Sequence, residues 1–237
     1  MKDRPRVLIT TDIDWASDWL LESFFDSLFS IVPNALAFST HDSKILKKYS
    51  SKGILDIGVH PNFRHNSSHG NNVSSVSRFA TKLFSTHKIY RSHGFVDTPE
   101  IRTEMRNRGF IYESNILKYN EPDLKPEKLL EGLTRLPCFW SDGWALRDTE
   151  MIDKDSIKKT EFFLGQPGLK VINIHPILFV NNCYSLQHYN QFRDQTIFFS
   201  KEEHKKFNNN THLGVCDYFK DIIVGDCDFC SIEDILP

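Results

Sequence analysis

The 237-residue sequence contains no apolar run that approaches the roughly 20 residues of a membrane-spanning helix, so we expect no stable membrane insertion. Its five cysteines are an odd number at irregular spacing, which predicts reduced thiols rather than a disulfide framework. Cys227 and Cys230 form a lone CxxC pair without the second pair of ligands that a structural zinc site needs. The formal net charge of only −2 argues against a dedicated nucleic-acid-binding protein.

Internal repeats and low-complexity tracts are also absent from the sequence. The content of 40% hydrophobic and 13% aromatic residues is ample for a core, and the length fits one barrel-sized domain or two small ones. One domain over residues 1–237 is the simplest prediction. The first residues lead into an apolar run without the apolar core of a signal peptide, from which we predict a cytoplasmic protein.

An apolar run near the start of the sequence ends in two carboxylates that are one residue apart. Residues 7–11 have the pattern of a buried strand in a parallel sheet, and Asp12 and Asp14 follow at the carboxyl end, where α/β folds place their sites. Two carboxylates this close repel each other, and a bound cation relieves the repulsion. The alternative is that one of them merely caps the helix that follows.

Strand and helix patterns alternate along the rest of the sequence. Short apolar runs predict strands over residues 35–39, 53–59, 88–91, 110–112, 133–140 and 169–174. Helical spacing of apolar residues predicts helices over residues 18–31, 43–50, 76–84, 99–107, 184–194 and 215–223. This alternation predicts an α/β protein whose parallel sheet closes into a barrel.

Candidate site residues lie at or just after the ends of five of the expected strands, at the edge where parallel strands end together. They are Asp12 and Asp14, His60, Arg91 with His93, Trp140 with Asp142, and His175. A single histidine at such a place is usually structural, but the ends of several strands of one barrel share the same rim. An aspartate with two histidines is a suitable ligand set for zinc or a similar divalent ion, with open positions for water and substrate.

The order of these motifs resembles that of the NodB-homology polysaccharide deacetylases, carbohydrate esterase family four, and within them the WbmS-like subfamily. The matching stretches are residues 11–16 (TDIDWA), 56–63 (DIGVHPNF), 67–70 (SSHG), 91–94 (RSHG), 137–140 (PCFW) and 172–176 (INIHP). The resemblance implies a distorted, incomplete (β/α) barrel and metal-dependent removal of an N-acyl group, acetyl or formyl, from a sugar. The implied context is the biosynthesis of a bacterial surface polysaccharide such as the O-antigen of lipopolysaccharide.

The resemblance also implies roles for individual residues. The general base, the arginine that orients it and the general acid would be Asp12, Arg91 and His175. The residues that line the substrate pocket would be Trp140, His93 and Asp142. These roles suit amide hydrolysis, which needs a generated nucleophile, an oxyanion stabiliser and a proton for the departing amine.

A divalent metal, with zinc preferred, is the implied cofactor. The first two ligands would be Asp14 and His60. The family places its next histidine ligand four residues after the first, where this sequence has Arg64. His69 is the preferred third ligand because it precedes a glycine in a matching stretch, and the other candidates are His65 and His93.

Two other functions compete with the deacetylase hypothesis. An apolar strand followed by Asp-x-Asp also opens the haloacid-dehalogenase phosphatases, in which Asp12 would be the nucleophile. Those enzymes have Thr or Val where this sequence has Ala16, and they have no use for His60 or His175. The third hypothesis is a non-catalytic carbohydrate-binding relative of the deacetylase fold, which Arg64 favours. In every case but the phosphatase, the expected partner is a sugar or a nucleotide- or lipid-linked sugar, and no nucleic acid.

Overall fold

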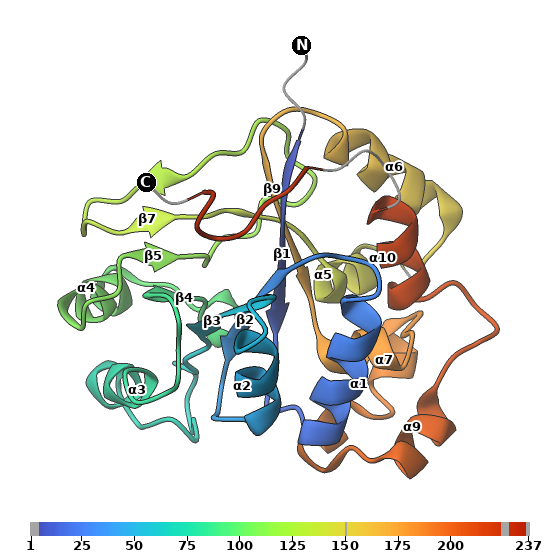
Figure 1. The fold of residues 1–237 in the computed structure, drawn as a ribbon, viewed down its shortest axis with the longest axis horizontal. Coiled ribbons are helices and arrows are strands. Elements are labelled where there is room, and N and C mark those ends of the chain that lie inside the picture. Colours follow the sequence, from blue (N-terminus) through green and yellow to red (C-terminus); the bar gives the residue numbers. More distant parts are fainter. Residues whose placement is uncertain (1–4, 150, 224–227, 236–237) are drawn as a thin grey trace.

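The computed structural model describes residues 5–149, 151–223 and 228–235, and Figure 1 shows the course of the chain. Cys227 lies outside the described residues, so the CxxC pair is described only at Cys230. The other four cysteines are free thiols. Within the described part of the chain, every helix is too short or too polar to span a bilayer.

One sheet runs through the molecule. Its strands are β1 (Arg6–Asp12), β2 (Ala35–Ser39), β3 (Leu55–Val59), β4 (Ile89–Tyr90), β5 (Tyr112–Glu113), β6 (Glu127–Lys128), β7 (Thr134–Arg135), β8 (Cys138–Ser141), β9 (Leu169–Ile174) and β10 (Asp228–Phe229). They follow the order β6-β7-β5-β4-β3-β2-β1-β9-β8, and β10 pairs with β1. Neighbouring strands in this order are parallel, apart from the antiparallel pair β6–β7.

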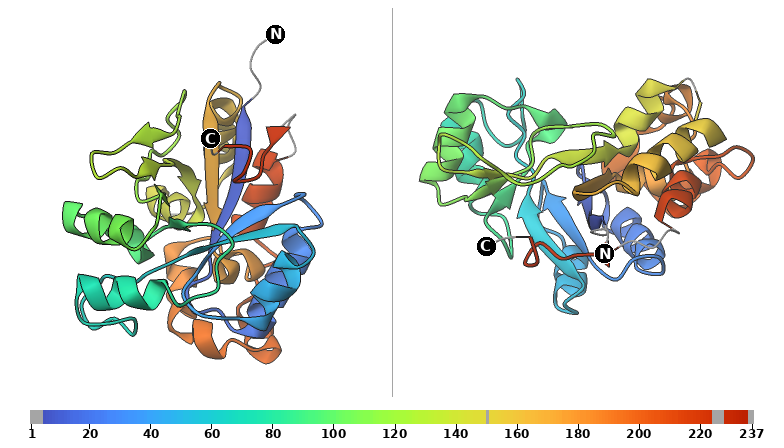
Figure 2. Two further views of the ribbon diagram at one scale, coloured as in Figure 1. Left: turned by 60° about the vertical axis from the view of Figure 1, so that its left-hand side comes forward. Right: turned by 90° about the horizontal axis from the view of Figure 1, so that it is seen from above.

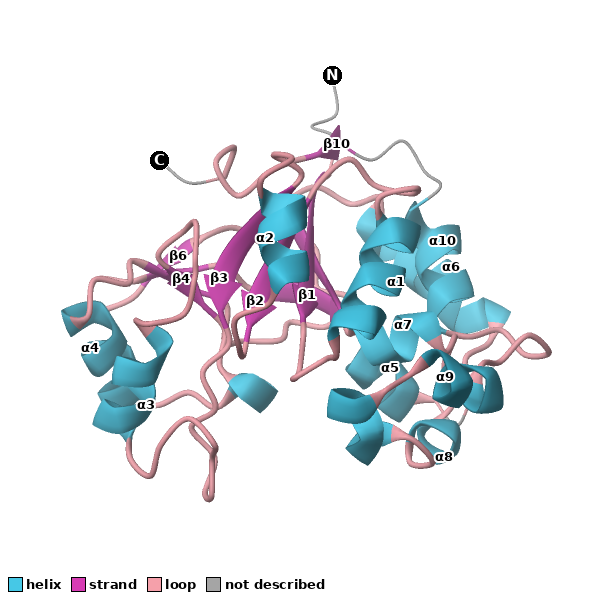
Figure 3. Cartoon of the chain, turned by 60° about the horizontal axis from the view of Figure 1, so that its bottom comes forward, coloured by secondary structure: helices cyan, strands magenta, loops and turns pink. Residues whose placement is uncertain are grey.

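Helices flank the sheet on two sides. The α-helices are α1 (Asp18–Leu28), α2 (Lys44–Ser50), α3 (Val73–Ala80), α4 (Pro99–Asn107), α5 (Asp142–Asp148), α6 (Lys154–Leu164), α7 (Pro176–Val180), α8 (Leu186–Tyr189), α9 (Lys201–Phe207) and α10 (Val215–Ile223), and the 3₁₀ helices are η1 (His93–Phe95) and η2 (Arg193–Phe198). Figures 2 and 3 show α3 and α4 on one side of the curved strands, and α1, α6, α7 and α10 on the other.

The expected incomplete (β/α) barrel is confirmed, and one expected strand differs in a way that explains the curl of the sheet. Residues 133–140 form β7 and β8 rather than one strand, with Pro137, which lacks a backbone N–H, between them. β7 pairs with β5, whereas β8 pairs with β9 on the opposite side of the sheet order. The chain between them therefore joins the two flanks of the sheet. The expected helix over 184–194 is shorter, because only α8 and the start of η2 are helical there.

Alternation along β1 and β9 decides which side chains face the interior of the curl. Val7 and Ile9 pack in the main core with residues of the surrounding helices, whereas Leu8 packs with residues from neighbouring strands. Because successive side chains of a strand point to opposite faces, Thr10 and Asp12 share the inner face with Leu8. This places the first carboxylate of the opening motif inside the curl.

Lys170 of β9 is a buried cation on the helix-covered face of the sheet. Its side chain is 0% exposed, and its Nζ has no hydrogen-bond partner among the described residues but lies 4.6 Å from the ring centroid of Phe139. Burial lowers the pKa of Lys170 to about 8, against the attraction of Asp123. The folded protein therefore binds this proton less tightly than the unfolded chain does.

We predict that Lys170→Met stabilises the protein at neutral pH by about 2 kcal/mol, because it removes a charge that burial penalises. The gain is complete below the folded pKa of about 8 and shrinks as the pH rises towards the ordinary lysine value of 10.5, where the unfolded chain also loses the proton. Urea unfolding at pH 7 and pH 10.5 measures this. An equal effect of the substitution at both pH values would contradict the prediction.

Candidate metal centre and active site

The turn after β1 holds two non-glycine residues in the left-handed conformation. Asp14 has a φ of 40° and Trp15 a φ of 56°. The backbone N–H of Ala16 donates to the carbonyl oxygen of Ile13 at 2.8 Å, so both central positions of this turn are left-handed, as in type I′ turns. Each costs on the order of 1 kcal/mol for residues with a side chain. Strain of this kind concentrates at functional sites.

Asp14, His60 and His93 form a cluster that can hold a metal ion. Each offers one ligand atom, and these atoms lie within 4.8 Å of one another. Nδ1 of His93 is 2.9 Å from Oδ1 of Asp14, and Nε2 of His60 is 3.3 Å from the same oxygen. The residues come from the turn after β1, the end of β3 and the start of η1, so three segments far apart in sequence meet at one edge of the sheet.

The hydrogen bonds of His60 test whether this cluster fits a cation. Its Nδ1 lies 2.7 Å from the carbonyl oxygen of Arg91, which can only accept, so Nδ1 carries the proton. The buried Nε2 is left with its lone pair and makes no hydrogen bond within the described chain. A lone pair that faces an ionised carboxylate is repelled unless a cation lies between them. This arrangement, with the second ring nitrogen held by a carbonyl, is typical of histidine ligands.

Asp14 is ionised in this setting. Burial raises the pKa of its carboxyl group, but the close contact with His60, the hydrogen bond from His93 and the charge of His175 outweigh burial and hold the pKa well below its usual value. A carboxylate that is charged at every pH of interest is the form that binds a divalent ion.

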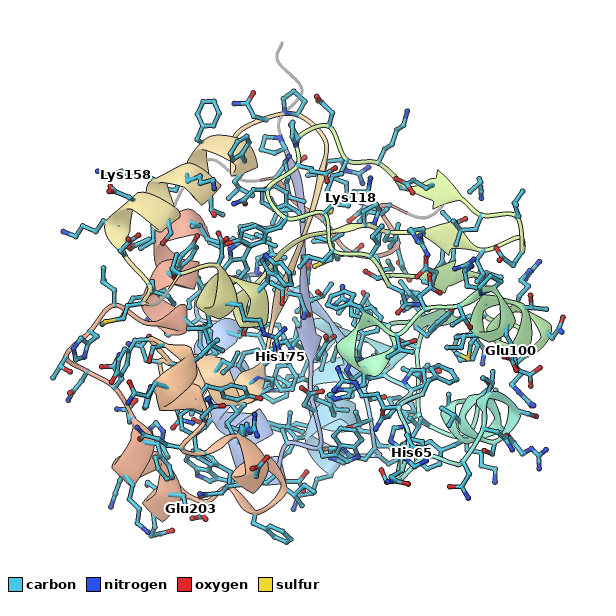
Figure 4. The ribbon with its side chains drawn as sticks, turned by 180° about the vertical axis from the view of Figure 1, so that it is seen from behind. His65, Glu100, Lys118, Lys158, His175 and Glu203 are labelled. Carbon is cyan, nitrogen blue, oxygen red and sulfur yellow. The ribbon has the colours of Figure 1, made fainter. Side chains whose placement is uncertain are left out.

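The other two histidine candidates lie outside the cluster. His65 is exposed on the loop after β3, and Figure 4 shows it apart from His175. His69, the preferred third ligand, is buried, but its Nδ1 accepts the backbone N–H of Asn62 at 3.1 Å and its ring stacks on Phe79 at 4.3 Å. Burial, with the nearby His60 and His93, lowers the pKa of His69 to about 4, so it is neutral. Its contacts hold the loop together, and the structure brings His93 to Asp14 instead.

Asp12 is the second carboxylate of the site, and it is only 3% exposed. Its Oδ1 accepts from Nη1 of Arg91 at 3.1 Å, and its Oδ2 accepts from Nδ2 of Asn173 at 3.0 Å. Burial raises the pKa of Asp12, whereas the charge of Arg91, helped by that of His175, lowers it, and the result lies below the ordinary value. Asp12 is therefore a fixed, ionised carboxylate beside the cluster.

His175 lies opposite the two carboxylates at the end of β9. Its Nε2 is 3.8 Å from Oδ2 of Asp12 and 3.7 Å from Oδ2 of Asp14. The buried Asp142 holds it from behind, because its two oxygens accept from Nδ1 and from the backbone N–H of His175, both at 2.6 Å. Burial lowers the pKa of His175, but Asp142 and then Asp14 and Asp12 raise it to about 10. Asp142 thus positions His175 rather than lining the pocket.

A cavity of about 700 Å³ opens over these groups. Its lining includes Asp12, Asp14, His60, His93 and His175, together with Trp15 and Trp144. Trp140, expected to line the pocket, is instead 0% exposed and packs against Tyr218 with ring centroids 5.1 Å apart. The tryptophan at the cavity is Trp144 of α5, which is 44% exposed.

Comparison with known sequences decides the family. Residues 9–193 match the family described as WbmS-like polysaccharide deacetylases. The chain belongs to this family. The WbmS-like assignment confirms the resemblance seen in the sequence motifs, and it leaves the haloacid-dehalogenase hypothesis without support.

Solved structures similar to this WbmS-like chain agree with the assignment. A Bordetella bronchiseptica protein, described as a polysaccharide deacetylase involved in O-antigen biosynthesis, is 26% identical with a TM-score of 0.78, over 93% of this chain and 90% of that one. A Mycobacterium smegmatis protein, described as a polysaccharide deacetylase, is 13% identical with a TM-score of 0.54, over 97% and 87% of the two chains, and shares the fold. A search of curated proteins found no match.

Two polar residues of this WbmS-like site were missed in the sequence. Asn173 and Thr10 each lie two residues before a predicted site residue, and both contact Nη1 of Arg91, at 2.5 Å and 3.0 Å. A polar side chain inside an apolar strand, on the face of a catalytic residue, is the signal that could have found them. Trp144 carried no comparable signal, because α5 was not among the expected helices.

Proposed function

We propose that this protein is a metal-dependent hydrolase that removes an N-acyl group, acetyl or formyl, from a sugar. The observation that carries the proposal is the meeting of a three-residue ligand cluster with an ionised carboxylate and a protonated histidine on the floor of one cavity. The reaction cleaves the amide C–N bond with one water, and yields a carboxylate and the amine of the sugar.

Three residues of the chain would hold the metal and two would move protons. Asp14, His60 and His93 are the proposed ligands, and zinc suits one carboxylate with two imidazoles. A divalent ion bound there would lower the pKa of a water molecule and polarise the amide carbonyl. Asp12 would take the proton of the attacking water, and Arg91 keeps Asp12 ionised and oriented. His175 would donate a proton to the departing nitrogen, since its raised pKa keeps it charged at neutral pH.

The biological setting is proposed from the related protein. The Bordetella bronchiseptica relative is described as involved in O-antigen biosynthesis, and a similar role in surface polysaccharide assembly is proposed here. We further propose action in the cytoplasm on a sugar precursor rather than on finished polymer. Detection of the native protein outside the cell would count against that setting.

Metal content tests the ligand set. We expect about one equivalent of zinc in the wild type. His60→Ala and His93→Ala should each lower the zinc affinity by more than about 100-fold, which exceeds the loss typical of residues that only support a ligand. His65→Ala is the matched control and should keep its zinc, as should His69→Ala, because both histidines lie outside the cluster. Elemental analysis after dialysis against a defined zinc buffer provides the measurement.

The pattern of losses separates the hypotheses. Zinc retained in His93→Ala but lost in His69→Ala would return the third ligand to His69. If the wild-type protein binds no divalent ion after reconstitution, the proposal of a metal-dependent hydrolase is refuted. The non-catalytic carbohydrate-binding alternative is then favoured. Circular dichroism of each variant shows that a loss of metal is not a loss of fold.

A further inference from the structure

Two arginines on the cavity wall have no carboxylate partner among the described residues. Arg64, on the loop after β3, and Arg147, on α5, both line the cavity that contains the ligand cluster. Neither forms an ion pair with any residue in the described part of the chain. Arg193 also lines the cavity, but its Nε is 3.5 Å from Asp194, so the argument rests on the first two.

Arg64 lies next to the segment that carries His93. Its guanidinium group lies directly over Gly94, the residue after His93, where a Cβ atom would overlap Nη2 of Arg64. Gly94 also has a φ of +65°, which glycine adopts without strain. Arg64 therefore places a permanent positive charge next to the segment that carries His93.

The carboxylates on the cavity floor do not account for these charges. Asp12 is paired with Arg91 at 3.1 Å, and Asp14 contacts His60 and His93. The two wall arginines are therefore surplus positive charge that faces the cavity. Guanidinium groups match the geometry and charge of phosphate oxygens, which they bind by charge-assisted hydrogen bonds.

The lining of the same cavity also includes exposed apolar side chains. Trp144, one helical turn from Arg147 on α5, is 44% exposed, and Ile197 of η2 is 55% exposed. Both line the cavity, as does Leu186 of α8. Exposed apolar surface next to unpaired cations fits a ligand that joins an anionic group to an apolar or aromatic one.

We propose that the substrate is an N-acyl sugar linked through a diphosphate to an apolar or aromatic group. The N-acyl sugar part of this inference rests on the proposed function. The acylated nitrogen would lie at the ligand cluster, the diphosphate at Arg64 and Arg147, and the attached group on Trp144 and Ile197. The attached group can be a nucleoside or a polyprenyl chain, and in both cases a diphosphate joins it to the sugar. A neutral polymeric sugar has neither the diphosphate nor the attached group.

Binding of substrate fragments tests the proposal without turnover. Uridine diphosphate, farnesyl diphosphate and the neutral chitotetraose are titrated by calorimetry into the wild-type protein, and again into Asp14→Asn to remove direct phosphate–metal contact. We expect at least one diphosphate to bind at least about tenfold more tightly than chitotetraose. Arg64→Gln and Arg147→Gln should each weaken diphosphate binding by about tenfold, and added salt should weaken it further.

Arg78→Gln is the matched control, because Arg78 is exposed on α3 and does not line the cavity. Tighter binding of uridine diphosphate identifies a nucleotide-linked sugar, and tighter binding of farnesyl diphosphate a lipid-linked one. Tighter binding of chitotetraose, no binding of either diphosphate, or equal binding by the wild type and both cavity-arginine variants would overturn the proposal. Diphosphate binding in a protein that hydrolyses no N-acyl sugar would instead refute the proposed function alone.

Discussion

Asp12→Asn is expected to lower kcat for N-acyl sugar hydrolysis by about 10³-fold and to leave the zinc content unchanged. Asn is close in shape to Asp and still accepts a hydrogen bond from Arg91, but it cannot take a proton from water. Since Asp12 is not in the ligand cluster, the metal should remain. Release of acetate or formate, followed under saturating substrate, measures the effect.

A matched substitution shows that the loss belongs to the site. Asp56 of β3 lies outside the cavity and pairs with His87 at 3.5 Å, so Asp56→Asn changes a carboxylate in the same way without touching the cluster. It should keep kcat within about threefold of the wild type, as surface substitutions usually have small effects. If Asp12→Asn retained a tenth or more of the activity, Asp12 would not be the base.

Asp142→Asn is expected to move the alkaline limb of the kcat profile to lower pH by about one to three units. In the wild type, burial lowers the pKa of His175, but Asp142, Asp14 and Asp12 raise it to about 10. The proton that the leaving amine needs is therefore present on His175 below that pH. The variant keeps a hydrogen-bond acceptor for Nδ1 but loses the largest charge that raises this pKa. Activity should therefore fall most steeply between pH 7 and 10 and recover towards lower pH.

The pH profile distinguishes this role from a merely structural one. A residue that only packs against His175 would lower kcat by the same factor at every pH. His175→Gln provides the comparison, because it has no proton to donate and should not recover activity at low pH. KM should change little in Asp142→Asn, since Asp142 is buried behind His175. An unchanged alkaline limb would contradict the assignment of His175 as the acid.

Strand periodicity in the sequence was enough to place the two residues of the proposed catalytic pair at one edge of the sheet. Asp12 and His175 follow apolar runs, and β1 and β9 pair in parallel over their length, with Thr11 opposite Ile174. Parallel strands end at one edge, so residues at their carboxyl ends meet whatever the loops do. The same logic placed His60 and Arg91, which directly follow β3 and β4 of the same sheet.

Trp140 shows where strand periodicity fails. The register of β8 against β9 shifts between Cys138 and Trp140, so Cys138 pairs with Val171 whereas Trp140 pairs with Ile172. One extra residue in a strand moves every later side chain to the opposite face. Because of this shift, the side chain of Trp140 faces the main core. No local pattern in the sequence indicates the shift.

The sequence by itself determined the family, the barrel-like fold and the residues at the strand ends, because these follow from local apolar patterns and ordered motifs. Only the tertiary structure shows which of His65, His69 and His93 lies beside Asp14 and His60, since that depends on how the loops after β3 and β4 cross the site. His69 is fastened to Asn62 and Phe79, while His93 begins η1 beside Asp14. Loop paths are set by contacts between distant segments, which a linear sequence does not display.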